Sequence, residues 1–448
     1  MVDQTHSFIA QFQEAAAQAE NPKAAAQAQM QLIGQWIAVC PLEFFSELRE
    51  HAPILAAPAF TLVTRYADVQ QVLTLNDIFT TDLLKHNMEQ FIGNTVVELP
   101  PSPEYERRKS ILRLAFPMQD LERYRQILIE EAALLLKRVD LQTGFDVTDY
   151  AKKLPAAAMS RYLGLGELPV DQVVQWMHDI NEGAVRNLAN LPRLNEPAAA
   201  ASAAVKPLIR DILERTRKRM KGQNSTPSFW QRLFKPQPAI APSSLSDPPT
   251  VLERYLHMQS VASTFTADED IISSLLFMLS ACIDLTATAI TNVVVELLHR
   301  PNILQEAIAA AQNNKDTELA GYIWEALRFR QPSPGVINTC VQDYTLGKGT
   351  PYAQTIPAGT QVMACSISAM HDPSVIDQPT EFIVGRPAHL AYTFFEAGLH
   401  TCHGKYFSQV QIPLAVQQIL KLGTPSPIDP LPKLQGYPTQ PFRIRVAS

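Results

Sequence analysis

The chain has 448 residues, enough to bury a large hydrophobic core, and its composition is that of an ordinary globular protein, with 46% hydrophobic and 18% charged residues. Its 17 glycines fall below the usual share of about 7%, which favours a helix-rich fold. The formal net charge of −6 argues against nucleic acid as a main partner.

The cysteines are spread along the chain and show no paired spacing. They lie at Cys40, Cys282, Cys340, Cys365 and Cys402, and no CxxC occurs. Five unpaired cysteines favour a reducing compartment over a disulfide framework. The N-terminal segment has no basic region followed by an apolar one, so we expect no secretory signal and predict a cytoplasmic protein.

The chain begins with a polar region and continues into a short β segment. Residues 1–40 are rich in Ala and Gln and predict a polar helical extension that lies on the surface. In residues 57–69, APAFTLVTRYADV, β-forming residues precede a helical pattern. We expect a strand or hairpin that runs into a helix.

Helical periodicity dominates from about residue 105 to residue 330. Apolar residues recur at i, i+3, i+4 and i+7 over 104–116 and 121–139, opposite charged faces. Two more helices are expected over 169–189 and 198–221, joined by the linker NLPRLNEP.

Residues 223–250 differ from their surroundings. They contain six prolines and seven Ser or Thr residues without periodicity, which predicts an exposed loop insertion. Its FWQRLFK core, aromatic and basic, is a candidate for docking or peripheral membrane contact. The alternative is a plain linker.

Residues 271–298 form the one apolar stretch long enough to cross a membrane, about 42 Å as a helix at 1.5 Å per residue. Asp284 lies at its centre, and a carboxylate inside a bilayer is expensive. We therefore predict a helix through the protein core and no transmembrane segment.

Strand character returns in residues 335–369, where β-forming residues flank the turn IPAGT. The predicted fold class is α+β, mainly α, with a large helical body and a minor β region. We expect one catalytic domain over 1–448, with the extension 1–40 and the insertion 223–250.

One stretch near the C-terminus, FFEAGLHTCHGKYF (394–407), places Cys402 between two histidines. A zinc site needs three or four ligands, and only His400 and His403 lie nearby. Attachment of a c-type haem requires CxxCH, but Leu399 occupies the position of the first cysteine. Both interpretations are disfavoured.

An axial thiolate on haem iron accounts for the unusual features of the same stretch. Gly398 and Gly404 permit close backbone approach around the sulfur of Cys402. Phe395 can cover the sulfur, and His400 can donate a ring N–H to a haem propionate. The helical pattern that follows would place the cysteine at a helix N-terminus, which favours a thiolate. The alternative is a buried cysteine that only packs.

These residues resemble the haem-binding signature of the cytochrome P450 family, Phe-x-x-Gly-x-His/Arg-x-Cys-x-Gly. All five positions match at fixed spacing, with Cys402 as the metal ligand. The residue after the phenylalanine is usually glycine in the family, whereas this chain has Glu396. The resemblance spans roughly residues 40–445 and implies the family's fold and a haem b bound through a cysteine thiolate.

Two further motifs occur in the family's order. EALR, with Glu325 and Arg328, resembles the family's Glu-x-x-Arg on a helix, where opposite charges at i,i+3 share a face. Arg386 matches the arginine that completes this network. The resemblance implies a structural role for these three residues.

The central helix departs from the family where protons pass to bound oxygen. The family usually has a glycine followed by an acid and a threonine. Here Cys282 takes the glycine position, Asp284 the acid position and Leu285 the threonine position, with Thr286 next. The resemblance implies catalytic roles for Asp284 and Thr286, yet about 200° of helix separates them. We expect a local distortion or an unusual route of proton delivery.

Two positions that bind the haem propionates in the family also differ. The family's His-x-x-x-Arg appears as Tyr105-x-x-x-Lys109, which still offers two donors. The arginine expected in the first strand after Glu-x-x-Arg is Asn338. Arg113 is a candidate substitute for the lost charge.

The resemblance implies a monooxygenase that oxidises an apolar small molecule with O₂ and electrons from a ferredoxin-like donor. The basic helix with Arg107, Arg108, Lys109 and Arg113 is a candidate docking face for that partner, or else a solvated helix face. Leu285 leaves open a peroxygenase, isomerase or lyase. A non-catalytic haem or ligand binder is the third hypothesis.

Overall fold

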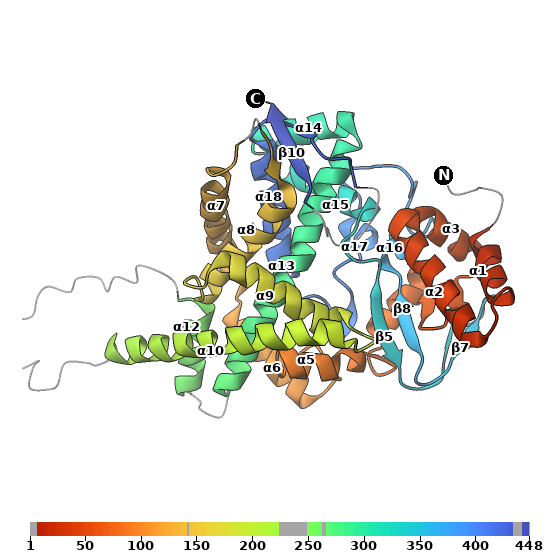
Figure 1. Cartoon of the computed structure of the whole chain (residues 1–448), viewed down its shortest axis with the longest axis horizontal. Coiled ribbons are helices and arrows are strands. Elements are labelled where there is room, and N and C mark those ends of the chain that lie inside the picture. The colour runs from red at the N-terminus through yellow and green to blue at the C-terminus, as the bar shows by residue number, and fades with distance from the viewer. Residues whose placement is uncertain (1–6, 141–142, 224–248, 262–265, 433–440, 448) are drawn as a thin grey trace, which may run out of the picture.

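The computed structural model describes residues 7–140, 143–223, 249–261, 266–432 and 441–447. Figure 1 shows a large helical body beside a smaller region that holds the main sheet and the N-terminal helices. This is the α+β, mainly α architecture that the sequence predicts. Most of the predicted insertion at 223–250 lies outside the described residues.

The long helix α13, Asp268–Leu298, runs through the helical body. It packs against α8 (Val147–Leu163), α9 (Val170–Asn181), α15 (Asp316–Phe329) and α18 (Lys405–Leu420). Among the described residues, α13 alone is long and apolar enough to cross a membrane, and 72% of its apolar window is buried inside the protein. That burial agrees with the predicted core helix.

The other helices surround these five or connect them. Their bounds are α4 Tyr66–Thr74, η1 Asp82–Leu84, α5 Lys85–Phe91, α6 Pro103–Ala115, η2 Met118–Asp120, α7 Leu121–Leu136, α12 Val251–Val261, α14 Pro301–Gln312, α16 Ser366–Ala369, α17 Ala388–Ala391 and η4 Gly398–His400. The start of α6 is specified locally, because the Ser102 hydroxyl accepts a hydrogen bond from the Tyr105 amide (3.1 Å) and Pro103 occupies the first turn.

The predicted helix pair between residues 169 and 221 forms with different bounds. The first helix, α9, ends at Asn181 and continues as one π-helical turn, η3 (Glu182–Arg186). The second, α10 (Pro192–Gln223), begins within the predicted linker because Pro192 is tolerated in a first helical turn. Figure 1 shows α10 extending beyond the body.

The N-terminal extension forms two helices, α1 (Phe8–Ala17) and α2 (Pro22–Val39), followed by α3 (Pro41–His51). It is less polar than expected, because its aromatic side chains pack inward. The Phe8 ring lies 5.3 Å from the Trp36 ring and 5.7 Å from the Phe44 ring of α3.

The main sheet has the strand order β1-β2-β8-β5-β3. Its strands are β1 Ile54–Ala56, β2 Thr61–Val63, β8 Gln361–Ala364, β5 Val336–Cys340 and β3 Phe79–Thr80, with β2 and β8 parallel and the other pairs antiparallel. The strand predicted within residues 57–69 is β2, which runs into α4 (Tyr66–Thr74) and forms a hairpin with β1, just before the predicted range. A second hairpin joins β6 (Tyr344–Leu346) to β7 (Gln354–Ile356).

A three-stranded sheet, β4-β10-β9, was not predicted. Its strands are β4 Phe145–Asp146, β10 Arg443–Ala447 and β9 Thr424–Pro427. Two residues in β4 and two prolines in β9 give no alternating pattern to detect. β4 and β9 form strands because each pairs with β10, and not because of local strand propensity.

Candidate functional site

A cavity of about 270 Å³ lies between α13 and the loop that carries Cys402. Its wall combines apolar side chains from α5, α13 and β5 with a few polar ones, and Cys402, Glu396, His400, Lys109 and Asp284 all reach it. Cys402 lines this cavity and is exposed, in contrast to the buried Cys340 and Cys365. The site therefore joins segments more than 100 residues apart.

Backbone amides surround the Cys402 side chain. The Cys402 amide donates to the Phe395 carbonyl (2.9 Å), which closes the loop. The backbone amides of Gly404 and Lys405, at the start of α18, lower the pKa of the sulfur. Burial raises the pKa of the Cys402 thiol to about 11, while these amides act in the opposite direction. A cation bound at the sulfur would favour the thiolate.

Gly398 meets a strict backbone requirement in the same loop. Its φ is +71°, and an added Cβ would lie 2.7 Å from the Leu73 carbonyl oxygen. Both features exclude a side chain there. Gly404 is less constrained, since an added Cβ would contact the Cys402 sulfur at an ordinary 3.7 Å.

The predicted propionate residues come together beside the cysteine loop. The Tyr105 hydroxyl donates to the Leu399 carbonyl (2.5 Å), and Lys109 Nζ lies 3.4 Å from the same oxygen. The His400 ring packs edge-on against the Tyr105 ring at 5.8 Å. Burial lowers the pKa of His400 to about 4 and also lowers the pKa of Lys109. All three side chains line the cavity, and the Tyr105 proton is already engaged with the Leu399 carbonyl.

The Phe395 ring is not among the described side chains that line the cavity. It packs against the rings of Phe394 (5.0 Å) and Trp324 (6.1 Å). Its contribution to the loop in this structure is the carbonyl that holds the Cys402 amide.

Glu325, Arg328 and Arg386 form one buried network. Arg328 donates to both carboxylate oxygens of Glu325 (2.7 and 3.1 Å), and Arg386 Nε donates to Oε1 (3.0 Å). The Ile383 amide and the Tyr392 hydroxyl also donate to Glu325, at 3.0 and 3.3 Å. The arginines bind backbone carbonyls as well, so the charges are paired and hydrogen-bonded as burial requires.

On α13, Asp284 and Leu285 line the cavity, whereas Thr286 is buried and does not. The helix is regular through this segment, so the local distortion that we considered is absent from it. The Thr288 hydroxyl, one turn further along the helix, donates to the Asp284 backbone carbonyl (2.8 Å). Thr286 and Asp284 therefore lie on different faces, as the 200° separation indicates.

Two side chains that the sequence did not reveal hold Asp284. His178 Nδ1 and an Arg186 guanidinium nitrogen each lie 3.2 Å from Asp284 Oδ2. Burial pushes the pKa of Asp284 upward, but the His178 hydrogen bond and the Arg186 charge outweigh it and hold the pKa below its usual value. The same hydrogen bond raises the pKa of His178. The side chain of His178 is 42% exposed and that of Asp284 only 4%, so the pair connects solvent to the cavity wall.

A family-wide comparison decides the class of protein. The cytochrome P450 family model matches residues 57–423. The chain belongs to the cytochrome P450 family. Pulcherriminic acid synthase of Bacillus subtilis is 21% identical over 397 residues, covering 85% of this chain and 87% of its own length. Cytochrome P450(BM-1) of Priestia megaterium is 20% identical over 395 residues, with coverage of 85% and 86%.

Solved structures share the fold of this cytochrome P450. CalO2 has a TM-score of 0.72 at 19% identity, covering 91% of this chain and 96% of its own. CYP109E1 from Bacillus megaterium, solved with testosterone, has a TM-score of 0.70 at 19% identity, with coverage of 92% and 98%. At these identities the likeness concerns the fold alone.

Membership in the cytochrome P450 family implies a haem held by a cysteine thiolate, and the residues of the cavity fit one. A single soft sulfur ligand that lines the cavity, Cys402, is a suitable axial ligand as a thiolate. Asn338, at the family's arginine position, is buried with an Nδ2 group that has no hydrogen-bond partner among the described residues. Within those residues no three His, Cys, Asp or Glu side chains gather as a metal site of their own.

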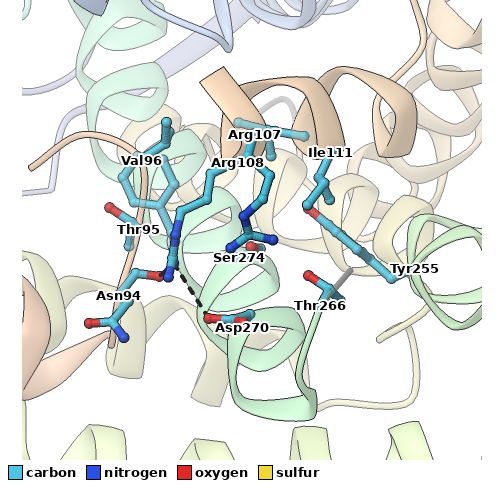
Figure 2. Close-up of a pocket in the computed structure, with 12 residues that line it drawn as sticks. Asn94, Thr95, Val96, Arg107, Arg108, Ile111, Tyr255, Thr266, Asp270 and Ser274 are labelled. Carbon is cyan, nitrogen blue, oxygen red and sulfur yellow. Dashed lines mark hydrogen bonds and ion pairs between the residues drawn. The ribbon is translucent and has the colours of Figure 1, made fainter. Parts of the chain in front are cut away.

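The basic helix α6 does not present one continuous basic face. Arg107 and Arg108 both pair with Glu104 (2.7 and 2.6 Å), and Lys109 is buried at the cavity. Figure 2 shows the side chains of Arg107 and Arg108 directed into a second cavity of about 30 Å³, where Arg108 also meets Asp270 (3.4 Å). This space admits one or two waters. Of the four predicted docking residues, Arg113 remains exposed.

Proposed function

We propose that this cytochrome P450 is a haem-thiolate monooxygenase that oxidises an apolar small molecule with O₂ and electrons from a ferredoxin-like partner. The observation that carries the proposal is the placement of Cys402 and Asp284 on one largely apolar cavity. When bound, a thiolate-ligated haem supplies the redox-active iron for this chemistry. The unpaired cysteines support the expectation of a cytoplasmic enzyme.

Cys402 would hold the iron through Sγ, with the Gly404 and Lys405 amides limiting the charge on sulfur. Lys109 and His400 line the cavity and would bind the haem carboxylates. The Nδ2 group of the buried Asn338, which has no hydrogen-bond partner among the described residues, is a further candidate donor. Of these three groups only Lys109 can carry a positive charge near neutral pH, because the pKa of His400 is lowered to about 4. They therefore neutralise less negative charge than the family's arginine pattern does. We therefore expect the haem carboxylates to keep part of their negative charge.

Asp284 would deliver protons to the cavity. Its Oδ2 atom receives the His178 hydrogen bond, and His178 reaches solvent, so a proton can enter at His178 and pass to Asp284. Arg186 keeps the carboxylate charged between transfers. Thr286 is turned away from the cavity, so a side-chain hydroxyl from that position is not part of this route.

The substrate would be held by apolar contact. Side chains that can provide it are Leu84, Met88, Val97, Phe277, Leu285 and Ile337. Two solved structures with this fold contain ligands as different as testosterone and a hexadecenoic acid carried by acyl carrier protein. Such variety indicates that the lining, rather than the fold, selects the substrate.

A peroxide-dependent enzyme is the second candidate, and Leu285 is the observation that favours it. An apolar side chain lines the cavity where the family usually has a hydroxyl. Peroxide already contains reduced oxygen, so its use needs no electron donor. An isomerase or lyase would likewise need neither donor nor proton relay.

Two measurements separate these functions. The reduced carbon monoxide spectrum of wild type should show the thiolate-ligated band, and Cys402→Ser should lose it. Turnover driven by NADPH, a ferredoxin and its reductase supports the monooxygenase. Turnover with hydroperoxide alone would replace it by the second candidate, and a sound spectrum without any turnover would favour a ligand binder.

A further inference from the structure

Three aromatic rings join the cavity wall to the interior of the helical body. Phe407 of α18 lines the cavity. Its ring centroid lies 5.4 Å from that of Tyr162 on α8 and 5.2 Å from that of Tyr124 on α7, and the two tyrosine rings lie 5.4 Å apart. Figure 1 shows these three helices packed side by side. Rings at such separations are in contact, so one side chain separates Tyr162 from the cavity.

The phenol groups of Tyr162, Tyr124 and Tyr105 differ in what accepts their protons. Tyr162 donates to Oδ2 of Asp120 at 3.0 Å. Tyr124 donates to the side-chain amide oxygen of Gln411, and Tyr105, which lines the cavity, donates to a backbone carbonyl. A phenol that loses an electron becomes strongly acidic, and a base that takes the proton stabilises the resulting radical. A carboxylate is such a base, whereas amide oxygens are not, so Tyr162 is the phenol of these three that can be oxidised most readily.

The surroundings of Asp120 make this proton transfer reversible. Arg254 donates to Oδ2 of Asp120, and a guanidinium nitrogen of Arg123 lies 3.8 Å from the same atom. Protonation of Asp120 would leave these two cations without their partner, which favours return of the proton. Tyr162 is 0% exposed and the side chain of Asp120 only 12% exposed, so bulk water has little access to the hydrogen bond between them.

We propose that Tyr162 is a redox-active residue, which gives an electron to an oxidised haem in the cavity while Asp120 takes its proton. This inference rests on the proposed haem-thiolate function. It gives the buried ring cluster a second role besides packing: Tyr162 removes oxidising equivalents that no substrate has consumed.

The electrons and protons of this step balance with a peroxide as the oxidant. Hydrogen peroxide withdraws two electrons from the haem, and Tyr162 returns one of them. The O–H bond of the phenol breaks, a new O–H bond forms at Oδ2 of Asp120, and a neutral tyrosyl radical remains. The second oxidising equivalent stays at the haem. One electron from the ferredoxin-like donor, together with the proton held by Asp120, then restores the phenol.

Freeze-quench electron paramagnetic resonance tests the proposal on the haem-loaded, substrate-free enzyme mixed with hydrogen peroxide. Wild type should give a tyrosyl radical signal, and its lines should narrow when ring-deuterated tyrosine is incorporated. Tyr162→Phe keeps the ring and should lose the signal. Its haem absorbance should also bleach faster, because the oxidising equivalents stay at the haem. Asp120→Asn keeps the phenol but removes the base, so its signal should be weaker than that of wild type.

Tyr150→Phe is the matched control on the same helix. Tyr150 is equally interior, at 3% exposure, but it donates to the Ala415 carbonyl (3.4 Å), and its ring packs against Phe145, which does not line the cavity. Its radical signal should equal that of wild type. An unchanged signal in Tyr162→Phe would overturn the proposal. If that variant does not fold, a wild-type signal that fails to narrow with deuterated tyrosine would overturn it as well.

Failure of the proposed function gives a different result. If wild type lacks the thiolate-ligated carbon monoxide band, the haem-thiolate function fails, and the Tyr162 proposal fails with it. If the band is present and hydrogen peroxide produces no tyrosyl signal, the Tyr162 proposal alone fails.

Discussion

Glu325→Gln should destabilise the protein strongly, because it removes the only negative charge from a network with two buried cations. The Glu325 side chain is fully buried and accepts five hydrogen bonds, from Arg328 twice, Arg386, Ile383 and Tyr392. Glutamine has the same size, but its NH₂ group would face a guanidinium in place of an oxygen.

The size of the expected loss of unfolding free energy follows from the arginine charges that stay buried after the substitution. Breaking a buried ion pair by removing one partner costs about 3–5 kcal/mol, since the other charge stays buried without compensation. Arg328 has 0% exposed side chain and cannot turn to solvent. Its backbone acceptors, the carbonyls of Pro379 (2.6 Å) and Glu381 (2.9 Å), keep part of its solvation, which places the expected loss near 3 kcal/mol.

Glu318→Gln on the same helix is the matched control. It breaks the ion pair between Glu318 and Lys315 (3.0 Å), whose side chains are 44% and 58% exposed. Exposed ion pairs contribute about 0–1 kcal/mol to stability. Urea unfolding followed by far-ultraviolet circular dichroism measures both variants. A loss below about 1 kcal/mol for Glu325→Gln, or one equal to that of the control, would refute the reasoning.

Three further predictions concern the site. His178→Gln should lower stability more at pH 5 than at pH 9. The raised pKa of His178 and the lowered pKa of Asp284 make the ion pair stabilising between about pH 4 and pH 6.5. Equal losses in the urea midpoint at the two pH values would contradict this. Gly398→Ala should reduce haem uptake and stability, because its Cβ would lie 2.7 Å from a backbone oxygen. The control Gly359→Ala, with φ +87° and open space around it, should lower stability by only about 1 kcal/mol and leave haem uptake intact. Leu285→Thr should increase product formed per NADPH consumed, because it adds a hydroxyl to the cavity wall next to Asp284; an unchanged ratio would exclude that role.

The cysteine loop could be predicted from sequence because its requirements are local. Gly398 must adopt a positive φ, and the Cys402 sulfur must meet amides only two and three residues ahead. Such features appear as fixed spacings along the chain. The same holds for Glu325 and Arg328, which are neighbours on one helix turn.

The partners of Asp284 could not be predicted because packing alone brings them together. His178 lies 106 residues from Asp284 in sequence, and Arg186 lies 98 residues away on a π-helical turn that no periodicity indicated. Similarly, the basic run at Arg107 and Arg108 predicts a charged docking face, but Glu104 pairs with both side chains and Asp270 pairs with Arg108. The positions of charged residues in a sequence do not indicate which group will neutralise each of them in the fold.

The burial of α13 and the pairing of Asp284 have one physical basis. An apolar helix of 31 residues could be stabilised by lipid as well as by protein, except at its central carboxylate. The protein supplies what a bilayer cannot: a histidine and an arginine, each 3.2 Å from Oδ2. The carboxylate is then held charged at the cavity wall, and its histidine partner reaches solvent. The pairing that allows α13 to be a core helix is therefore the same contact through which, in the proposed function, protons would reach the cavity.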